Sequence, residues 1–94
     1  MPHIREKHIK ITVIGNVQGV GFRYSAKKMA DSIGIKGIVK NLYNGNVYIE
    51  AEGSEVQLRH FIDWCQQGSS YSRVDDVKIE DGELKHYTQF EITF

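Results

Sequence analysis

Hydrophobic and polar residues alternate along several stretches of the chain, which is typical of strands with one buried face. The first stretch has Ile9, Ile11 and Val13 separated by polar residues. Further strand patterns lie in residues 37–42, in residues 46–53, around Val74, Val77 and Ile79, and where Phe90, Ile92 and Phe94 alternate strictly. Within residues 46–53, the predicted inward face consists of Val47, Ile49 and Ala51.

Two other stretches repeat their hydrophobic residues at the spacing of a helix. The first stripe consists of Phe22, Ala26, Met29, Ala30 and Ile33, and Gly34 follows where a C-terminal cap belongs. The second consists of Leu58, Phe61, Ile62 and Cys65 and continues to Gly68. Ser54 is its predicted N-cap, because Gln57 stands three residues later as in a capping box.

The strand patterns within residues 37–53 are separated only by Tyr43, Asn44 and Gly45. Asn-Gly readily supplies the positive φ angles of a tight turn, so this segment is predicted to be a hairpin. The elements then follow the order βαββαβ, with a further strand at the C-terminus. This order predicts an α+β fold, the ferredoxin-like α/β sandwich, in which two helices cover one face of an antiparallel sheet.

The chain length and charge favour one small domain with no global attraction for polyanions. Its 94 residues are enough for a single core, so residues 1–94 are expected to form one domain, with residues 1–6 as a short flexible lead. Lysine and arginine number 12 and so do aspartate and glutamate, which disfavours nucleic-acid and membrane partners. Any anion site must therefore be local.

Cysteine and hydropathy patterns indicate a cytoplasmic location and no metal cofactor. Cys65 is the only cysteine, so the chain can form no internal disulfide, as is usual in a reducing compartment. No apolar run approaches the roughly 18 residues of a membrane span. The four histidines are scattered and no carboxylates cluster at ligand spacing beside residues 15–23, so a catalytic metal is not expected. Nothing in the pattern requires more than a monomer.

The segment GNVQGVGFR, residues 15–23, is the strongest candidate for a site. Three glycines between a predicted strand and a predicted helix allow backbone N–H groups to surround an anion, although a simple tight turn needs them too. Arg23 favours the interpretation as an anion site. A cation in the first turn of a helix is disfavoured by the helix dipole, so an arginine there is best explained by an anion beside it. The alternative for Arg23 is a side chain that is merely solvent-exposed.

Three motifs resemble the acylphosphatase signature: VQGVGFR at residues 17–23, GIVKNLYNGNV at 37–47 and EAEG at 50–53. With the predicted order of elements, the resemblance covers nearly the whole chain. Two positions depart from the family pattern, Ile38 where many members have an aromatic residue and Ser69 where a proline is common. Both departures are expected to affect local packing rather than activity.

The resemblance implies hydrolysis of acyl phosphates to a carboxylate and inorganic phosphate, without metal or cofactor. It implies that Arg23 is catalytic and binds the phosphate, and that Asn41 orients the attacking water. It further implies that phosphate is bound by the backbone amides of Gln18, Gly19, Val20, Gly21 and Phe22. Asn41 also has a simpler interpretation, as a polar residue that ends a strand.

Two other functions remain open from the sequence. A ferredoxin-like sheet can serve as a non-catalytic binding module for RNA or phosphate-containing ligands. We expect its open face to expose Tyr48 beside Glu50 and Glu52, which would repel phosphates. The same site could also serve a larger activity that handles carbamoyl phosphate, but the short single domain favours a free-standing enzyme.

Overall fold

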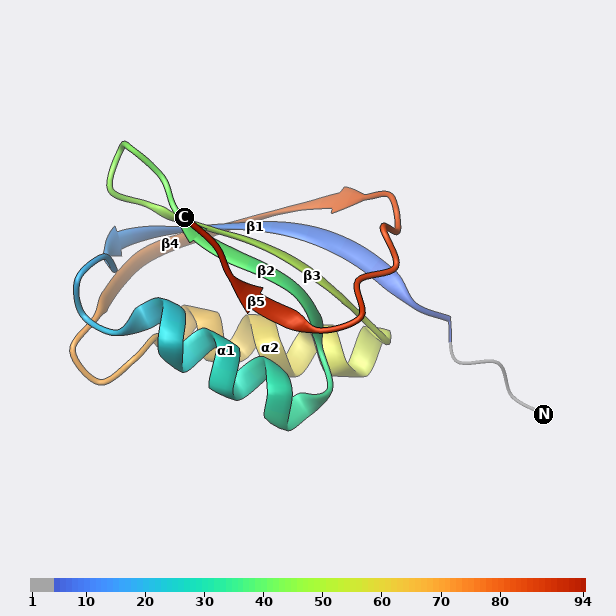
Figure 1. Ribbon diagram of the computed structural model, residues 1–94. Helices are drawn as coiled ribbons and strands as arrows, with labels where there is room; N and C mark the ends of the chain where they lie inside the picture. Colours follow the sequence, from blue (N-terminus) through green and yellow to red (C-terminus); the bar gives the residue numbers. More distant parts are fainter. Residues whose placement is uncertain (1–4) are drawn as a thin grey trace.

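Two helices pack on one face of a five-stranded sheet (Figure 1). The computed structural model describes residues 5–94, so most of the lead expected at residues 1–6 lies outside the described residues. The elements are β1 (Lys7–Asn16), α1 (Phe22–Ile33), β2 (Lys36–Asn41), β3 (Val47–Gly53), α2 (Glu55–Gln67), β4 (Arg73–Gly82) and β5 (Phe90–Ile92). The predicted βαββαβ order with a terminal strand is confirmed.

The strands lie in the order β4-β1-β3-β2-β5. β1 pairs antiparallel with both β3 and β4, and β2 pairs antiparallel with β3, as expected for the ferredoxin-like arrangement. β5 instead pairs parallel with β2, so the sheet is mixed rather than fully antiparallel. The reason is geometric: β4 ends at the end of the sheet where β2 begins, and a strand that returns from there beside β2 must run in the same direction.

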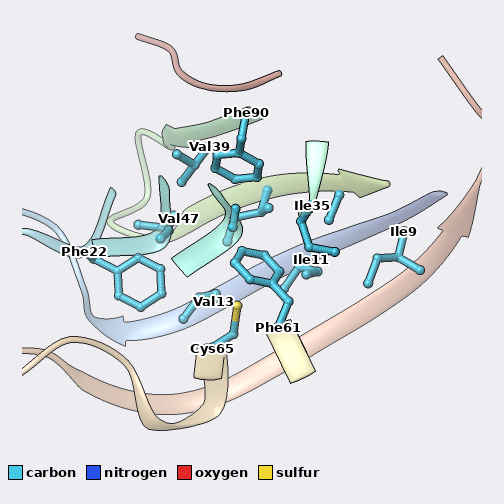
Figure 2. Packing of buried hydrophobic residues seen from close by; sticks show 14 of the residues in the cluster. Ile9, Ile11, Val13, Phe22, Ile35, Val39, Val47, Phe61, Cys65 and Phe90 are labelled. Atoms are coloured by element: carbon cyan, nitrogen blue, oxygen red, sulfur yellow. The ribbon is translucent and has the colours of Figure 1, made fainter. Parts of the chain in front are cut away.

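The core lies between the helices and the sheet (Figure 2). Both predicted helical stripes and the predicted inward strand faces contribute to it. Among its fully buried members are Ile11, Val13, Phe22, Val39, Val47, Ile49, Phe61, Cys65 and Phe90. Phe61 of α2 meets Phe90 of β5 edge to face, with ring centroids 5.8 Å apart. Each such side chain contributes about 1.5–3 kcal/mol by leaving water, so this layer fixes how the helices sit on the sheet.

The helix ends agree with the sequence prediction, and the hairpin differs from it in one detail. Gly34 ends α1 with φ 98°, and Ser54 and Gln57 form the predicted capping box of α2. The hairpin loop reaches positive φ only at Gly45, not at Asn44. Leu42 N–H donates to the carbonyl of Asn46 across the base of the loop, at 2.9 Å. The three residues predicted to separate the strands do form the loop, but only one of them, Gly45, is left-handed.

The face of the sheet opposite the helices is covered where β1 begins and β3 ends. The carboxylates of Glu50 and Glu52 are buried, with residue exposures of 6% and 1%, so the expectation that β3 displays them to solvent is wrong. Residues 83–89, here called the crossing segment, pass over this end on their way from β4 to β5 (Figure 1). The backbone N–H groups of Lys85 and Tyr87 both donate to Glu52.

A network of polar side chains satisfies these buried carboxylates. His8 Nδ1 lies 2.7 Å from Glu52, and its Nε2 lies 3.3 Å from Glu50. The hydroxyls of Tyr48 and Tyr87 and the ammonium of Lys85 also reach Glu50, at 2.7–2.8 Å. Burial alone would raise the pKa of Glu50, but the hydrogen bonds from Lys85, Tyr87 and Tyr48 lower it to about 2. The network requires ionised carboxylates.

We expect the free energy of unfolding to fall as the pH is lowered from about 5 to about 2. The folded-state pKa of Glu50 lies near 2 and the unfolded value is 4.5, so its contribution is complete above the unfolded pKa and is lost as pH falls through the folded pKa. For Glu50 alone this amounts to about 3 kcal/mol. Urea unfolding between pH 7 and pH 2 measures it.

Matched variants separate this effect from general acid destabilisation. Glu50→Gln should show a weaker dependence of stability on pH, whereas Glu91→Gln, at an exposed position on β5, should keep the wild-type dependence. Equal slopes for the wild type and Glu50→Gln would contradict the prediction.

Candidate active site

The glycine loop, residues 17–21, connects β1 to α1 at one end of the sheet. Gly19 and Gly21 have φ angles of 74° and 78°, which other residues rarely adopt. A Cβ atom at either position would meet nothing within 4 Å, so these glycines serve the backbone conformation rather than close packing. Left-handed residues within such a loop turn successive N–H groups toward one side, where they can surround an anion.

The N-terminus of α1 adds positive potential beside the glycine loop. Gly21 is the N-cap, no side chain caps the helix and no acidic residue occupies its first turn. The first N–H groups of a helix have no partner within the helix, and they carry the positive end of its dipole. Arg23 lies in the same turn and, within residues 5–94, forms no ion pair with a carboxylate. This combination favours a bound anion.

A hollow of about 290 Å³ lies between the glycine loop, the end of β2 and the C-terminal segment. Its lining residues are Val17, Gly19, Gly21, Phe22, Arg23, Tyr24, Asn41, Ile92 and Phe94. The structure therefore brings Arg23 and Asn41 together with three of the five predicted amide-bearing residues. Gln18 and Val20 are not among the lining residues.

The last two residues of the chain contact the side chain of Arg23. Its Nη1 donates to the carbonyl of Thr93 at 3.3 Å, and its guanidinium carbon lies 5.1 Å from the centre of the Phe94 ring. Thr93 is itself fixed, because its N–H donates to the carbonyl of Val39 in β2 at 2.8 Å. The parallel pairing of β5 with β2 thus brings residues 93 and 94 to the arginine.

Asn41 is the last residue of β2 and pairs with Val47 across the hairpin. Its Oδ1 is buried and receives no hydrogen bond from any described residue. Buried side-chain acceptors are normally satisfied, so an unpartnered one in a hollow is available for a ligand or water. The alternative interpretation of Asn41, a polar strand end, does not account for this atom.

Two side chains tie the glycine loop to other parts of the fold. Gln18 Nε2 donates to the carbonyls of Leu42 and Asn46, at 2.7 and 2.8 Å. Ser69 Oγ donates to the carbonyl of Val20 at 3.4 Å. The two loop residues that do not line the hollow are thus the ones through which the loop is braced.

Sequence reasoning missed the apolar part of the lining. Tyr24, Ile92 and Phe94 form much of the wall beside Arg23. The alternation of Phe90, Ile92 and Phe94 predicts a strand, but β5 ends at Ile92 and Phe94 is fully exposed. Only the position of β5 at the edge next to β2 could have indicated that this segment reaches the site.

Comparisons with known proteins identify the family of the chain. The family model described as Acylphosphatase matches residues 9–92. Curated acylphosphatases from Ligilactobacillus salivarius and Archaeoglobus fulgidus are both 43% identical to the chain, over 94% and 92% of it and over 99% and 97% of their own lengths.

A solved structure gives the same result for the fold. The crystal structure of acylphosphatase from Bacillus subtilis superposes with a TM-score of 0.91 at 37% identity, covering 96% of this chain and all of the other. Since the sequence matches extend over both motifs of the hollow and the fold matches throughout, the chain belongs to the acylphosphatase family, whose members are hydrolases that act on acyl phosphates.

Proposed function

We propose that the hollow binds the phosphate group of an acyl phosphate and that Asn41 orients the water that attacks it. The supporting observation is the convergence of Arg23, the glycine loop and an unpartnered Asn41 Oδ1 on one hollow. The products are a carboxylate and inorganic phosphate.

Phosphate binding rests on the positive groups at the helix start. The guanidinium of Arg23 can donate two parallel hydrogen bonds to phosphate oxygens, and the backbone N–H groups of residues 18–22 are proposed to donate to the remaining oxygens. In phosphoryl transfer the charge spreads over the equatorial oxygens, so donors fixed in advance stabilise the transition state. The cradle therefore serves both binding and catalysis.

The attack needs orientation more than proton transfer. The carboxamide oxygen of Asn41 can accept a hydrogen bond from water and hold it in line with the bond to be broken, but it cannot act as a base. The water oxygen bonds to phosphorus, and the bond from phosphorus to the acyl oxygen breaks with its electron pair on the carboxylate. A carboxylic acid has a pKa of about 4, so this group leaves without a general acid. The proton of the water passes to solvent.

Turnover is expected to persist in a chelator and to be inhibited competitively by inorganic phosphate. Within residues 5–94, no three His, Cys, Asp or Glu side chains are grouped so that they could hold a metal ion. Phosphate should compete because it is the product and occupies the same donors. Release of phosphate or carboxylate from acetyl phosphate and benzoyl phosphate, with and without EDTA, measures both effects. Loss of activity in EDTA with recovery on adding a divalent ion, or inhibition that substrate cannot overcome, would contradict the proposal.

We further propose a cytoplasmic monomer, acting as one domain, with no nucleic-acid or membrane partner. The balanced charge of the chain and the buried free thiol of Cys65 support this. No helix in the described part of the chain is long and apolar enough to cross a membrane.

An RNA-binding sheet is not favoured by the face opposite the helices. An RNA platform needs aromatic rings free to stack on bases. Here the hydroxyl of Tyr48 donates a hydrogen bond to Glu50, and the crossing segment covers the face where β1 begins and β3 ends. We therefore retain hydrolysis as the proposed function.

A further inference from the structure

We propose that the side chain of Gln18 is a positioning residue that holds Asn41 in register with the phosphate-binding loop. This inference rests on the function proposed above for the glycine loop and Asn41. It assigns to Gln18 a role separate from that of its backbone amide.

The geometry joins two segments that are distant in sequence. Gln18 belongs to the glycine loop, and its two acceptors lie 24 and 28 residues further along the chain. Leu42 directly follows Asn41, and Asn46 directly precedes its strand partner, Val47. The carbonyls of Leu42 and Asn46 thus flank the residue pair that contains Asn41.

Both carbonyls also take part in the hydrogen bonds that close the hairpin, since Gly45 N–H donates to the carbonyl of Leu42 at 3.2 Å. Leu42 N–H donates to the carbonyl of Asn46, and this carbonyl accepts from Gln18 Nε2 as well. A displacement of the hairpin base would therefore break bonds to the loop, and a displacement of the loop would pull on the hairpin base. The position of Asn41 relative to the glycine loop is fixed at this point.

The chemistry of the amide suits this task. A primary amide nitrogen has two N–H groups and no formal charge, so one atom can serve two carbonyls in a partly buried place. A carboxylate at the same position would present only acceptors to two other acceptors. A methionine would keep the length of the side chain and donate nothing.

The phosphate cradle depends on this brace less than Asn41 does. Its conformation is set by the left-handed residues Gly19 and Gly21, and Val20 is tethered separately by Ser69. Loss of the Gln18 side-chain bonds should therefore displace Asn41 and the water it holds more than it alters phosphate binding. Misplacing a reacting group by about 1 Å can cost on the order of 10²-fold in rate.

Gln18→Met tests the inference through the separation of turnover from binding. We expect kcat for benzoyl phosphate to fall roughly 10- to 100-fold, and the inhibition constant of inorganic phosphate to change less than about 3-fold. Gln89→Met is the matched control, because Gln89 is exposed and lies beside Gly37, at the other end of β2 from Asn41. Its kcat should equal that of the wild type. Normal turnover in a folded Gln18→Met protein, or equal losses in kcat and phosphate binding, would overturn the inference.

A double-variant cycle identifies the residue through which Gln18 acts. In an Asn41→Ala background, adding Gln18→Met should lower kcat by less than about 3-fold, because the group that it positions is already absent. Full additivity would overturn the inference. If Asn41→Ala alone kept normal turnover, the proposed function itself would fail, whereas a slow Asn41→Ala beside a normal Gln18→Met would remove only the role of Gln18.

Gln18→Glu supplies a second readout if the methionine variant folds poorly. A carboxyl group facing two carbonyls should have a raised pKa, and its protonated form regains one donor. We therefore expect the ratio of the variant's kcat to the wild type's to rise as pH is lowered from 8 to 5. A constant ratio, with thermal unfolding showing a folded protein, would count against positioning by donated hydrogen bonds.

Discussion

Replacing Arg23 with alanine should lower kcat/KM for acyl phosphates by at least about 10³-fold and should weaken inhibition by inorganic phosphate in parallel. The guanidinium is the only fully charged donor that lines the hollow in the described part of the chain. A positioned arginine contributes about 10³ to 10⁵ in phosphoryl transfer, because its charge opposes the charge on the equatorial oxygens. Steady-state kinetics with benzoyl phosphate and phosphate inhibition measure the two losses.

Two further variants make this result specific. Arg23→Lys keeps the charge but loses the paired donors, so it should recover only a small part of the activity. Arg59→Ala removes an exposed arginine of α2, whose contact with Glu55 is 3.8 Å long, and should leave the kinetics unchanged. An Arg23→Ala protein that bound phosphate as well as the wild type would show that the anion lies elsewhere.

Replacing Asn41 with alanine should lower kcat roughly 10²- to 10³-fold, as does removal of one fixed transition-state donor in other hydrolases. The inhibition constant of phosphate should change little, since the carboxamide is proposed to contact the water rather than the anion. Destabilisation of the fold would not explain this loss of turnover, because alanine breaks no hydrogen bond of the unpartnered Oδ1 with the described residues. Single-turnover and steady-state kinetics measure the loss of turnover, and thermal unfolding measures whether the fold is destabilised.

The control for Asn41 lies at the end of β1. Asn16 is exposed and its side chain makes no hydrogen bond with the described residues, so Asn16→Ala should retain wild-type turnover. Turnover in Asn41→Ala within about 3-fold of the wild type would refute the water-orienting role while leaving phosphate binding by Arg23 intact.

Local rules of the sequence predicted the helices and their ends. The capping box of Ser54 and Gln57 and the glycine that ends α1 depend only on neighbouring residues, and both are present. The parallel pairing of β5 and the burial of Glu50 depend instead on where residues 83–89 cross the sheet. Periodicity carries no information on such a crossing, and acidic residues in a strand are normally exposed.

In the candidate site, too, the sequence predicted what depends on neighbouring residues and not what depends on long-range contacts. The glycine spacing and Arg23 are adjacent in sequence, so an anion site could be predicted from them. The link to Asn41 came only from the resemblance to a family, because the two segments meet through β1, β3 and β2. The side-chain bonds of Gln18 and the approach of Phe94 are long-range contacts, which no pattern within either segment predicts.

The approach of Phe94 to Arg23 has a practical consequence for protein production. Because β5 runs parallel to β2, the chain after Ile92 heads for the same end of the sheet as the glycine loop. An affinity tag or a fused reporter joined behind Phe94 would emerge at the mouth of the hollow and obstruct small molecules that approach it. β1 starts at the far end of the sheet (Figure 1), so a purification handle placed ahead of it leaves that entrance clear.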